Sequence, residues 1–204
     1  KPPLEGVPEP NRGWSMDCMS DSLVSGQRFR TFNVVDEGTR EALAIEVETS
    51  LPAERVMIKD SRPLPKQIRV DNGPEGISSK LVEWSEKNGV RLQTIQPGKL
   101  TQNAYIERLN RTFRCEVQDA SLFRLLSEVR EIVHHWMLVY NEERPHDSLG
   151  NLPPETFVDN KPQTKRPPHP PLFSNCPVNG GAYRGPLRVE AAAVGHRRRR
   201  HYPL

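Results

Sequence analysis

The chain has 204 residues, of which 35% are hydrophobic and 6% aromatic, and it contains 20 prolines. This length suits one domain with a packed core and a short appendage, and the low share of core-forming residues predicts an unpacked part. The net charge of +3 hides an asymmetry, because residues 158–204 carry nine Lys/Arg against two acidic residues, whereas residues 1–157 carry 20 basic and 24 acidic residues. A body that binds nucleic acid through bulk positive charge is therefore excluded.

Cysteine usage and hydropathy indicate the cellular compartment of the protein. Three widely spaced cysteines without a CxxC pair indicate neither a disulfide framework nor a zinc site, and we expect a cytosolic protein. No apolar run approaches the ~18 residues of a membrane span, and we expect no membrane partner. Residues 1–13 are predicted to be a linker, and since no Met precedes them, we expect the chain to begin inside a longer protein.

The first predicted elements are strands. Trp14, Met16 and Cys18 alternate with other residues as a strand requires. Residues 28–48 form a predicted hairpin that turns at 36–39, and its second strand is predicted to place Leu43, Ile45 and Val47 on one face.

Strands and helices alternate further along the chain. A short strand is predicted at 67–71, a helix at 77–88 and another strand at 90–96. A helix that starts near Thr101 has an apolar stripe, and a second helix is expected to be capped by Ser121. The two stripes are Ile106, Leu109, Phe113 and Val117, and Leu122, Leu125, Val129, Ile132, Trp136 and Tyr140. This order predicts an α/β fold, a mixed sheet with antiparallel hairpin strands and parallel strands, flanked by helices.

Asp71 ends the strand at 67–71 and is followed by Asn-Gly. A type I′ hairpin turn is one interpretation of this triplet, but it needs a strand on each side, and a helical period follows. The alternative is a carboxylate at the carboxyl end of a strand, where open α/β sheets place their active groups. Both interpretations remain open, and the helical period favours the second.

Two further acids are candidate partners of Asp71. Asp17 lies among apolar residues of a predicted central strand, where an unpaired charge costs several kcal/mol. Glu107 lies at the edge of an apolar helix face, and an ordinary solvated glutamate is the alternative interpretation. Two aspartates and a glutamate are hard oxygen ligands of the kind that Mg²⁺ or Mn²⁺ accepts, and such a trio can hold two ions at a phosphodiester.

Four segments, WSMDCMSD, RVDNGPE, GKLTQNAYIERLNRTFRCE and YNEERPHDSLGNLPPETF, together resemble one family of proteins. They are similar to the catalytic core of OrfB-type DDE transposases of bacterial insertion sequences, which are related to retroviral integrases. The resemblance runs from Trp14 to Phe157, which predicts a core at 14–157 and a Pro-rich, basic, disordered tail at 158–204. The 35 residues between Asp71 and Glu107 match the spacing of that family.

The resemblance implies a ribonuclease H-like fold with Asp17, Asp71 and Glu107 as a catalytic, metal-binding triad. It implies Mg²⁺ or Mn²⁺, with two ions, and cleavage of DNA followed by attack of a 3′-hydroxyl on another phosphodiester. The partners implied are the DNA of element ends and target and further copies of the chain, in the bacterial cytoplasm at the nucleoid. Candidate DNA-binding residues on the matching segments are Lys99, Asn103, Asn110, Arg111 and Arg114, and the two asparagines are alternatively expected to orient Glu107.

The chain also departs from the family pattern. Only 16 residues, 51–66, fill the place of a full crossover helix, and Pro63 and Pro65 restrict their second half. Gly38 stands where the family tends to have an aromatic residue, which predicts lost apolar volume. These departures suggest a truncated copy, so two alternatives to a working transposase remain open. The chain is either a decayed, inactive remnant or a noncatalytic module that binds DNA or a protein partner.

Overall fold

The computed structural model describes residues 9–49, 63–71, 79–95 and 103–160. The chain divides into two compact units, Lys1–Pro168 and His169–Leu204, and every described residue belongs to the first. Most of the predicted short crossover, Lys99 and the predicted tail from residue 161 onward lie outside the described residues.

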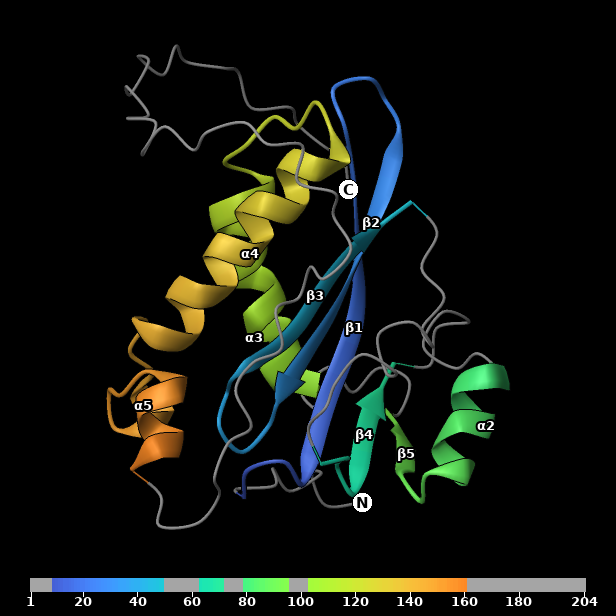
Figure 1. Cartoon of the computed structure of the whole chain (residues 1–204), viewed down its shortest axis with the longest axis vertical. Helices are drawn as coiled ribbons and strands as arrows, with labels where there is room; N and C mark the ends of the chain where they lie inside the picture. Colours follow the sequence, from blue (N-terminus) through green and yellow to red (C-terminus); the bar gives the residue numbers. More distant parts are fainter. Residues whose placement is uncertain (1–8, 50–62, 72–78, 96–102, 161–204) are drawn as a thin grey trace, which may run out of the picture. The chain divides into compact units, whose positions relative to one another are not determined.

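Five strands form one mixed sheet with the order β3-β2-β1-β4-β5 (Figure 1). The strands β1 (Gly13–Ser22), β2 (Arg28–Asp36) and β3 (Ala42–Glu48) pair antiparallel. β4 (Gln67–Val70) pairs parallel with β1, and β5 (Arg91–Thr94) pairs parallel with β4. The predicted α/β fold with a mixed sheet is confirmed, and β1 is its central strand.

Helices cover both faces of this sheet. α2 (Ser79–Lys87) packs Leu81 and the half-buried Trp84 against an apolar cluster with β1, β2 and β4. α3 (Ala104–Phe113), its continuation η2 (Arg114–Gln118) and α4 (Leu126–Glu142) pack on the other face (Figure 1). Two short helices follow, η3 (Asp147–Leu149) and α5 (Pro154–Asp159), so regular structure continues two residues beyond the predicted core boundary at 157.

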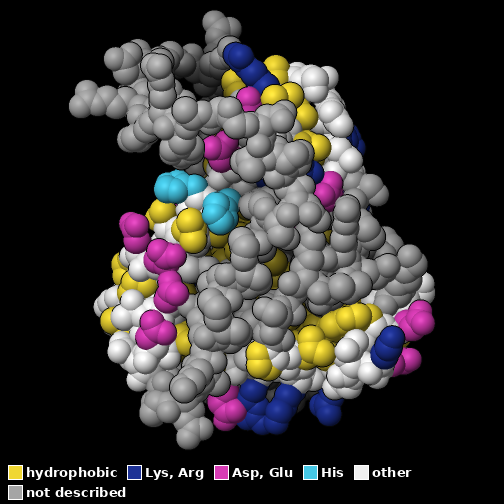
Figure 2. Space-filling view, in the orientation of Figure 1, with side chains coloured by type: hydrophobic (Ala, Val, Ile, Leu, Met, Phe, Trp, Pro, Cys, Tyr) yellow, Lys and Arg dark blue, Asp and Glu magenta, His cyan; other side chains and the backbone are white. Residues whose placement is uncertain are grey.

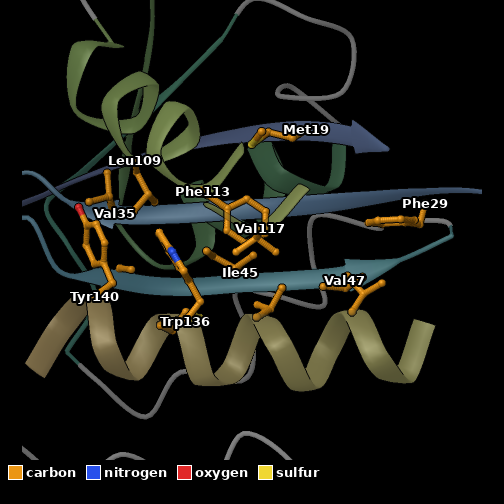
Figure 3. Packing of buried hydrophobic residues seen from close by; sticks show 14 of the residues in the cluster. Met19, Phe29, Val35, Ile45, Val47, Leu109, Phe113, Val117, Trp136 and Tyr140 are labelled. Atoms are coloured by element: carbon orange, nitrogen blue, oxygen red, sulfur yellow. The ribbon is translucent and has the colours of Figure 1, made fainter. Parts of the chain in front are cut away.

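The larger core lies between α3, α4 and the first three strands (Figure 3). All four residues of the stripe predicted for the first long helix, Ile106, Leu109, Phe113 and Val117, are at most 2% exposed. Trp136 of α4 stacks on Tyr140 at 4.9 Å between ring centroids and meets Phe113 edge-on at 5.2 Å. This packing fixes α3 on the sheet and with it the position of every side chain that α3 carries.

The prediction that Leu43, Ile45 and Val47 share one face is wrong for Leu43. The pairing of β2 with β3 shifts between Val34 and Val35, and this shift leaves Leu43 as an extra residue on β3. Such a bulge reverses the alternation of the strand. Leu43 therefore packs in the α2-side cluster, while Ile45 and Val47 pack under α4.

The prediction that Ser121 caps the second long helix is also wrong. α4 begins at Leu126, and the Glu128 carboxylate accepts hydrogen bonds from the backbone N–H groups of Arg124 (2.8 Å) and Leu125 (3.3 Å). A glutamate in the first turn replaces the serine because it satisfies two backbone donors before the helix. Three residues of the predicted stripe, Leu122, Leu125 and Ile132, are exposed as a result, while Val133 and Met137 are buried.

Gly38 removes no volume from the core. A Cβ built on it would lie 2.3 Å from the Glu9 carbonyl oxygen, so the backbone of residues 9 and 10 fills the place of a side chain. The prediction that this position loses apolar volume is therefore wrong.

No helix in the described ranges has both the length and the apolar character that a membrane crossing requires.

Candidate active site

Asp17 lies in the middle of β1 on the face covered by α3. Its Oδ1 accepts a hydrogen bond from the Cys18 backbone N–H at 2.8 Å, and its Oδ2 accepts one from Asn110 Nδ2 at 2.8 Å. The side chain is half-buried, which agrees with a carboxylate at the border between the core and solvent. The two hydrogen bonds hold the carboxylate in one orientation and support its charged form.

Asn110 belongs to a chain of hydrogen bonds that crosses from α3 to the sheet. Its Oδ1 accepts a hydrogen bond from Asn33 Nδ2 at 2.7 Å, and Asn33 is the residue opposite Asp17 on β2. Asn110 is only 8% exposed. Both ends of its amide are used inside the protein, so in the structure it orients Asp17 rather than Glu107.

Asp71 and Glu107 lie within electrostatic range of Asp17. Asp71 directly follows β4, which is parallel to β1, and Glu107 is in the first turn of α3. Burial raises the pKa of Asp17 above its ordinary value, the negative charges of Asp71 and Glu107 raise it further, and the bonds from Cys18 and Asn110 lower it. The charges of Asp71 and Glu107 thus act on an aspartate in the middle of β1, although the three acids are 54 and 36 residues apart in the chain.

The three carboxylates do not form a ready-made coordination shell. Within the described ranges, no three His, Cys, Asp or Glu side chains lie close enough together to hold a single metal ion. The side chains of Asp71 and Glu107 are exposed, and residues 72–78 and 96–102 lie outside the described residues. The chemistry of the donors fits Mg²⁺ or Mn²⁺, because carboxylate oxygens are the ligands these ions prefer.

The other residues predicted to bind DNA are either exposed or buried. Arg111 and Arg114 are exposed on α3 and η2, four and seven residues after Glu107. Asn103 precedes α3 and is 3% exposed, its Oδ1 has no hydrogen-bond partner, and it makes no side-chain cap to the helix. On the face shown in Figure 2, acidic side chains gather along the left side and basic side chains at the lower edge.

Asn33 is the residue of this site that sequence reasoning missed. It is fully buried, and besides Asn110 it also contacts the Met19 sulfur at 3.2 Å. The available signal was an amide inside the apolar run TFNVV of a predicted strand. A buried amide needs partners, so its position predicts a polar group on the covering helix.

Comparisons with known proteins agree on one family. Residues 7–99 match the Integrase core domain family, and residues 88–154 match a second family of the same description. The 39.2 kDa protein of insertion element IS476 from Xanthomonas euvesicatoria is 38% identical over 156 residues, 74% of this chain and 45% of that protein. The 31.7 kDa protein of insertion element IS407 from Burkholderia multivorans is 41% identical over 154 residues, 73% of this chain and 56% of that protein. The chain thus spans about half the length of these relatives.

Solved structures share the fold. One is the simian T-cell lymphotropic virus intasome in complex with PP2A regulatory subunit B56 gamma, with a TM-score of 0.63 and 14% identity over 83% of this chain and 62% of that chain. Another is the HTLV-2 integrase catalytic core domain in complex with magnesium, in its trimeric form, with a TM-score of 0.53 and 12% identity over 72% of this chain and 96% of that chain. The predicted ribonuclease H-like fold is therefore confirmed.

Proposed function

Since the chain belongs to the insertion-element proteins that carry an integrase core domain, we propose that it is the catalytic core of a DNA transposase. In this proposal Asp17, Asp71 and Glu107 hold Mg²⁺ or Mn²⁺, with two ions, at a DNA phosphodiester. The reaction is cleavage of a DNA strand that exposes a 3′-hydroxyl, followed by attack of that hydroxyl on another phosphodiester, whose own 3′-oxygen leaves. The working form contains several copies of the chain on DNA in the bacterial cytoplasm. The observation that carries the proposal is that the charges of Asp71 and Glu107 both act on Asp17.

The protein's own groups have separate parts in this proposal. Asn110 and the Cys18 backbone N–H hold Asp17 in place through the bonds described above. When bound, the metal supplies activation of the attacking oxygen and charge stabilisation of the leaving oxygen. The three like-charged carboxylates repel one another without it, and a divalent cation removes this repulsion.

Arg111 and Arg114 are the proposed contacts to DNA phosphates. Arg114 follows Glu107 by seven residues, which is about 10 Å along the helix at ~1.5 Å per residue, on nearly the same face. Arginines at this distance fix the register of a bound strand without reading its sequence. Lys99 and Asn103 remain proposed contacts of the same kind.

A noncatalytic, DNA-binding or partner-binding remnant is the second candidate. The observation that favours it is the lack of a closed three-carboxylate cluster among the described residues. The two candidates differ in one property, because the remnant binds DNA without breaking a phosphodiester.

Nicking of supercoiled plasmid by the purified chain in Mn²⁺ separates the two candidates. We expect nicking by the wild-type chain and at least about a hundredfold less by Asp71→Asn, since a missing ligand disrupts the whole site. Asp21→Asn is the matched control, because Asp21 lies on β1 four residues from Asp17 and bonds only its neighbour Ser22 in the described structure. Binding of plasmid without nicking, in a chain that melts cooperatively, would establish the remnant instead.

A further inference from the structure

A pocket lies beside residues 144–146, Arg-Pro-His, which the proposed function leaves without a role. Its volume is about 380 Å³, counted with its open mouth. It is formed by the end of β2, the following turn, α3, the end of α4 and the segment after α4. The polar and aromatic residues that line it are Arg40, Tyr105, Arg108, Tyr140, His146 and Ser148.

The pocket has an excess of positive charge. Arg40 and Arg108 line it, and neither forms an ion pair with any residue in the described part of the chain. A third arginine, Arg144, lies nearby, but Glu116 binds its guanidinium at 2.5 Å. The negative charge of Asp147 raises the pKa of His146. The two lining arginines are therefore not neutralised within the described structure.

Arg40 is held in place by contacts that leave part of its guanidinium unused. Its guanidinium carbon lies 3.8 Å from the centroid of the Tyr105 ring, and its Nε donates to Ser148 Oγ at 3.3 Å. Its Nη1 is buried and has no hydrogen-bond partner. The backbone of Arg40 is left-handed, with φ at 61°, a conformation that residues with a Cβ rarely adopt and that is frequent at functional sites.

His146 has a second buried polar atom without a hydrogen-bond partner. Its Nε2 is buried without a hydrogen-bond partner, and its ring stands edge-on to Tyr140 with 5.0 Å between centroids. Its pKa is lowered to about 4, first by burial and then by the positive charges of Arg108, Arg144 and Arg40, while Asp147 acts in the opposite direction. The ring is therefore neutral at pH 7. A neutral imidazole retains one N–H that can donate a hydrogen bond.

We propose that this pocket binds a phosphate group, with Arg40 and Arg108 as its charged contacts and His146 as a further donor. Guanidinium groups match phosphate oxygens in a planar fork, and a tetrahedral phosphate has enough acceptors for three donors that approach from different elements. A bound anion would also satisfy the two buried atoms that have no partner, Arg40 Nη1 and His146 Nε2.

This phosphate site is separate from the carboxylate site. Arg108 is adjacent to Glu107 on α3, so its side chain points about 100° around the helix from that of Glu107. The phosphate comes either from the backbone of bound DNA or from a free phosphate compound. The DNA source rests on the proposed function, whereas the phosphate site itself does not.

The test follows the arginine Nε–H and histidine ring signals by NMR in the full 204-residue chain, with EDTA present so that no divalent metal contributes. Inorganic phosphate is titrated first, and a short mixed-sequence DNA duplex second. We expect saturable shifts of the Arg40, Arg108 and His146 signals. Loss of one charge-assisted contact in Arg108→Gln should weaken phosphate binding about tenfold.

Arg28→Gln is the matched control, because Arg28 is exposed at the far end of β2 and belongs to neither site. We expect its phosphate affinity to stay within about twofold of wild type. Arg40→Lys keeps the charge but loses the fork, so it should also weaken binding, and thermal melts check that each variant is folded.

Each outcome decides one question. If the duplex displaces phosphate from the pocket signals, the phosphate belongs to DNA. If phosphate binds and the duplex leaves these signals unchanged, the site stands as one for free phosphate compounds and the DNA source is wrong. If neither ligand shifts the signals, or if Arg108→Gln and Arg28→Gln behave alike, the proposal is overturned. None of these readouts depends on nicking, so failure of the catalytic proposal is detected separately.

Discussion

Asp17 is the residue at which the demands of folding and of the proposed chemistry conflict. It is half-buried beside two other carboxylates, and two hydrogen bonds only partly compensate, since its pKa remains raised. Asparagine has nearly the same shape and no charge, but its single side-chain oxygen can accept only one of the two bonds, and its Nδ2 would face a donor at the other. Because relief of the repulsion offsets the lost bond, we expect Asp17→Asn to change the free energy of unfolding in EDTA at pH 7 by no more than about 1 kcal/mol, or about 2–4 °C in Tm.

Thermal melts with and without Mn²⁺ check this expectation. The wild-type chain should gain Tm on addition of Mn²⁺, and Asp17→Asn should gain much less, because a ligand that binds only the folded state stabilises it. A variant that melts more than about 4 °C below wild type in EDTA would contradict the conflict that we infer at Asp17.

The lowered pKa of His146 predicts how the stability of the fold depends on pH. Its pKa falls from 6.5 to about 4 on folding, first through burial and then through Arg108, Arg144 and Arg40. Between these values the unfolded chain binds more protons than the folded chain, so this histidine's contribution to stability is complete above pH 6.5 and is lost as the pH falls towards 4.

Urea unfolding at several pH values measures this effect, with Tyr140 and Asp147 as the other titratable groups near the ring. We expect His146→Gln to reduce the loss of stability between pH 6.5 and 4. An identical pH profile for wild type and His146→Gln would show that the ring is not held neutral by its surroundings.

At the scale of the element, β3 is an edge strand that side chains of α4 bind at both ends, Arg130 at Val47 and Glu48 and Asn141 at Ala42. Asn141 Oδ1 accepts a hydrogen bond from the Ala42 backbone N–H at 2.9 Å, and Asn141 Nδ2 donates to the Ala42 carbonyl at 3.0 Å. Both groups are buried, and the bulge at Leu43 begins directly beside them. Asn141 therefore provides the pairing that a sixth strand would otherwise supply.

Asn141→Ala should lower the free energy of unfolding by about 1–3 kcal/mol, because it leaves two buried backbone groups without partners. Hydrogen exchange at the Ala42 amide should quicken in the same variant. Glu142→Ala removes the exposed neighbouring residue of α4 and should change neither quantity. Unchanged exchange at Ala42 in Asn141→Ala would mean that the bulge holds the strand edge by itself.

The two long helices show what periodicity can and cannot predict. The stripe of α3 was predictable residue by residue, because its apolar residues follow one helical period and all four are buried. The start of α4 was not, because Leu122 and Leu125 continue the same period outside the helix. The bulge on β3 was unpredictable for a related reason, since an extra residue changes faces without changing the sequence pattern.

At the scale of the whole molecule, the site depends on strand order. β4 pairs parallel with β1, on the side of this central strand opposite to β2 and β3. Asp71 directly follows β4, and its charge acts on Asp17.

Residue type, strand ends and spacing indicate Asp17, Asp71 and Glu107 as candidates, and their joint metal site stays a prediction. The residues that support Asp17 could not be predicted from the sequence. The bonds from Asn110 to Asp17 and from Asn33 to Asn110 join residues 93 and 77 positions apart, and no local pattern indicates such contacts. Arg40, Arg108 and His146 likewise come together only through the fold.

The most direct test of the central claim, that Asp17, Asp71 and Glu107 form one metal site, is binding of Mn²⁺ followed by EPR. We predict saturable binding by the wild-type chain and at least about tenfold weaker binding by Asp17→Asn, Asp71→Asn and Glu107→Gln alike. Glu131→Gln, at an exposed position of α4, should bind as wild type does. Equal Mn²⁺ binding by wild type and all three variants would contradict the account, because the ion would then be held elsewhere.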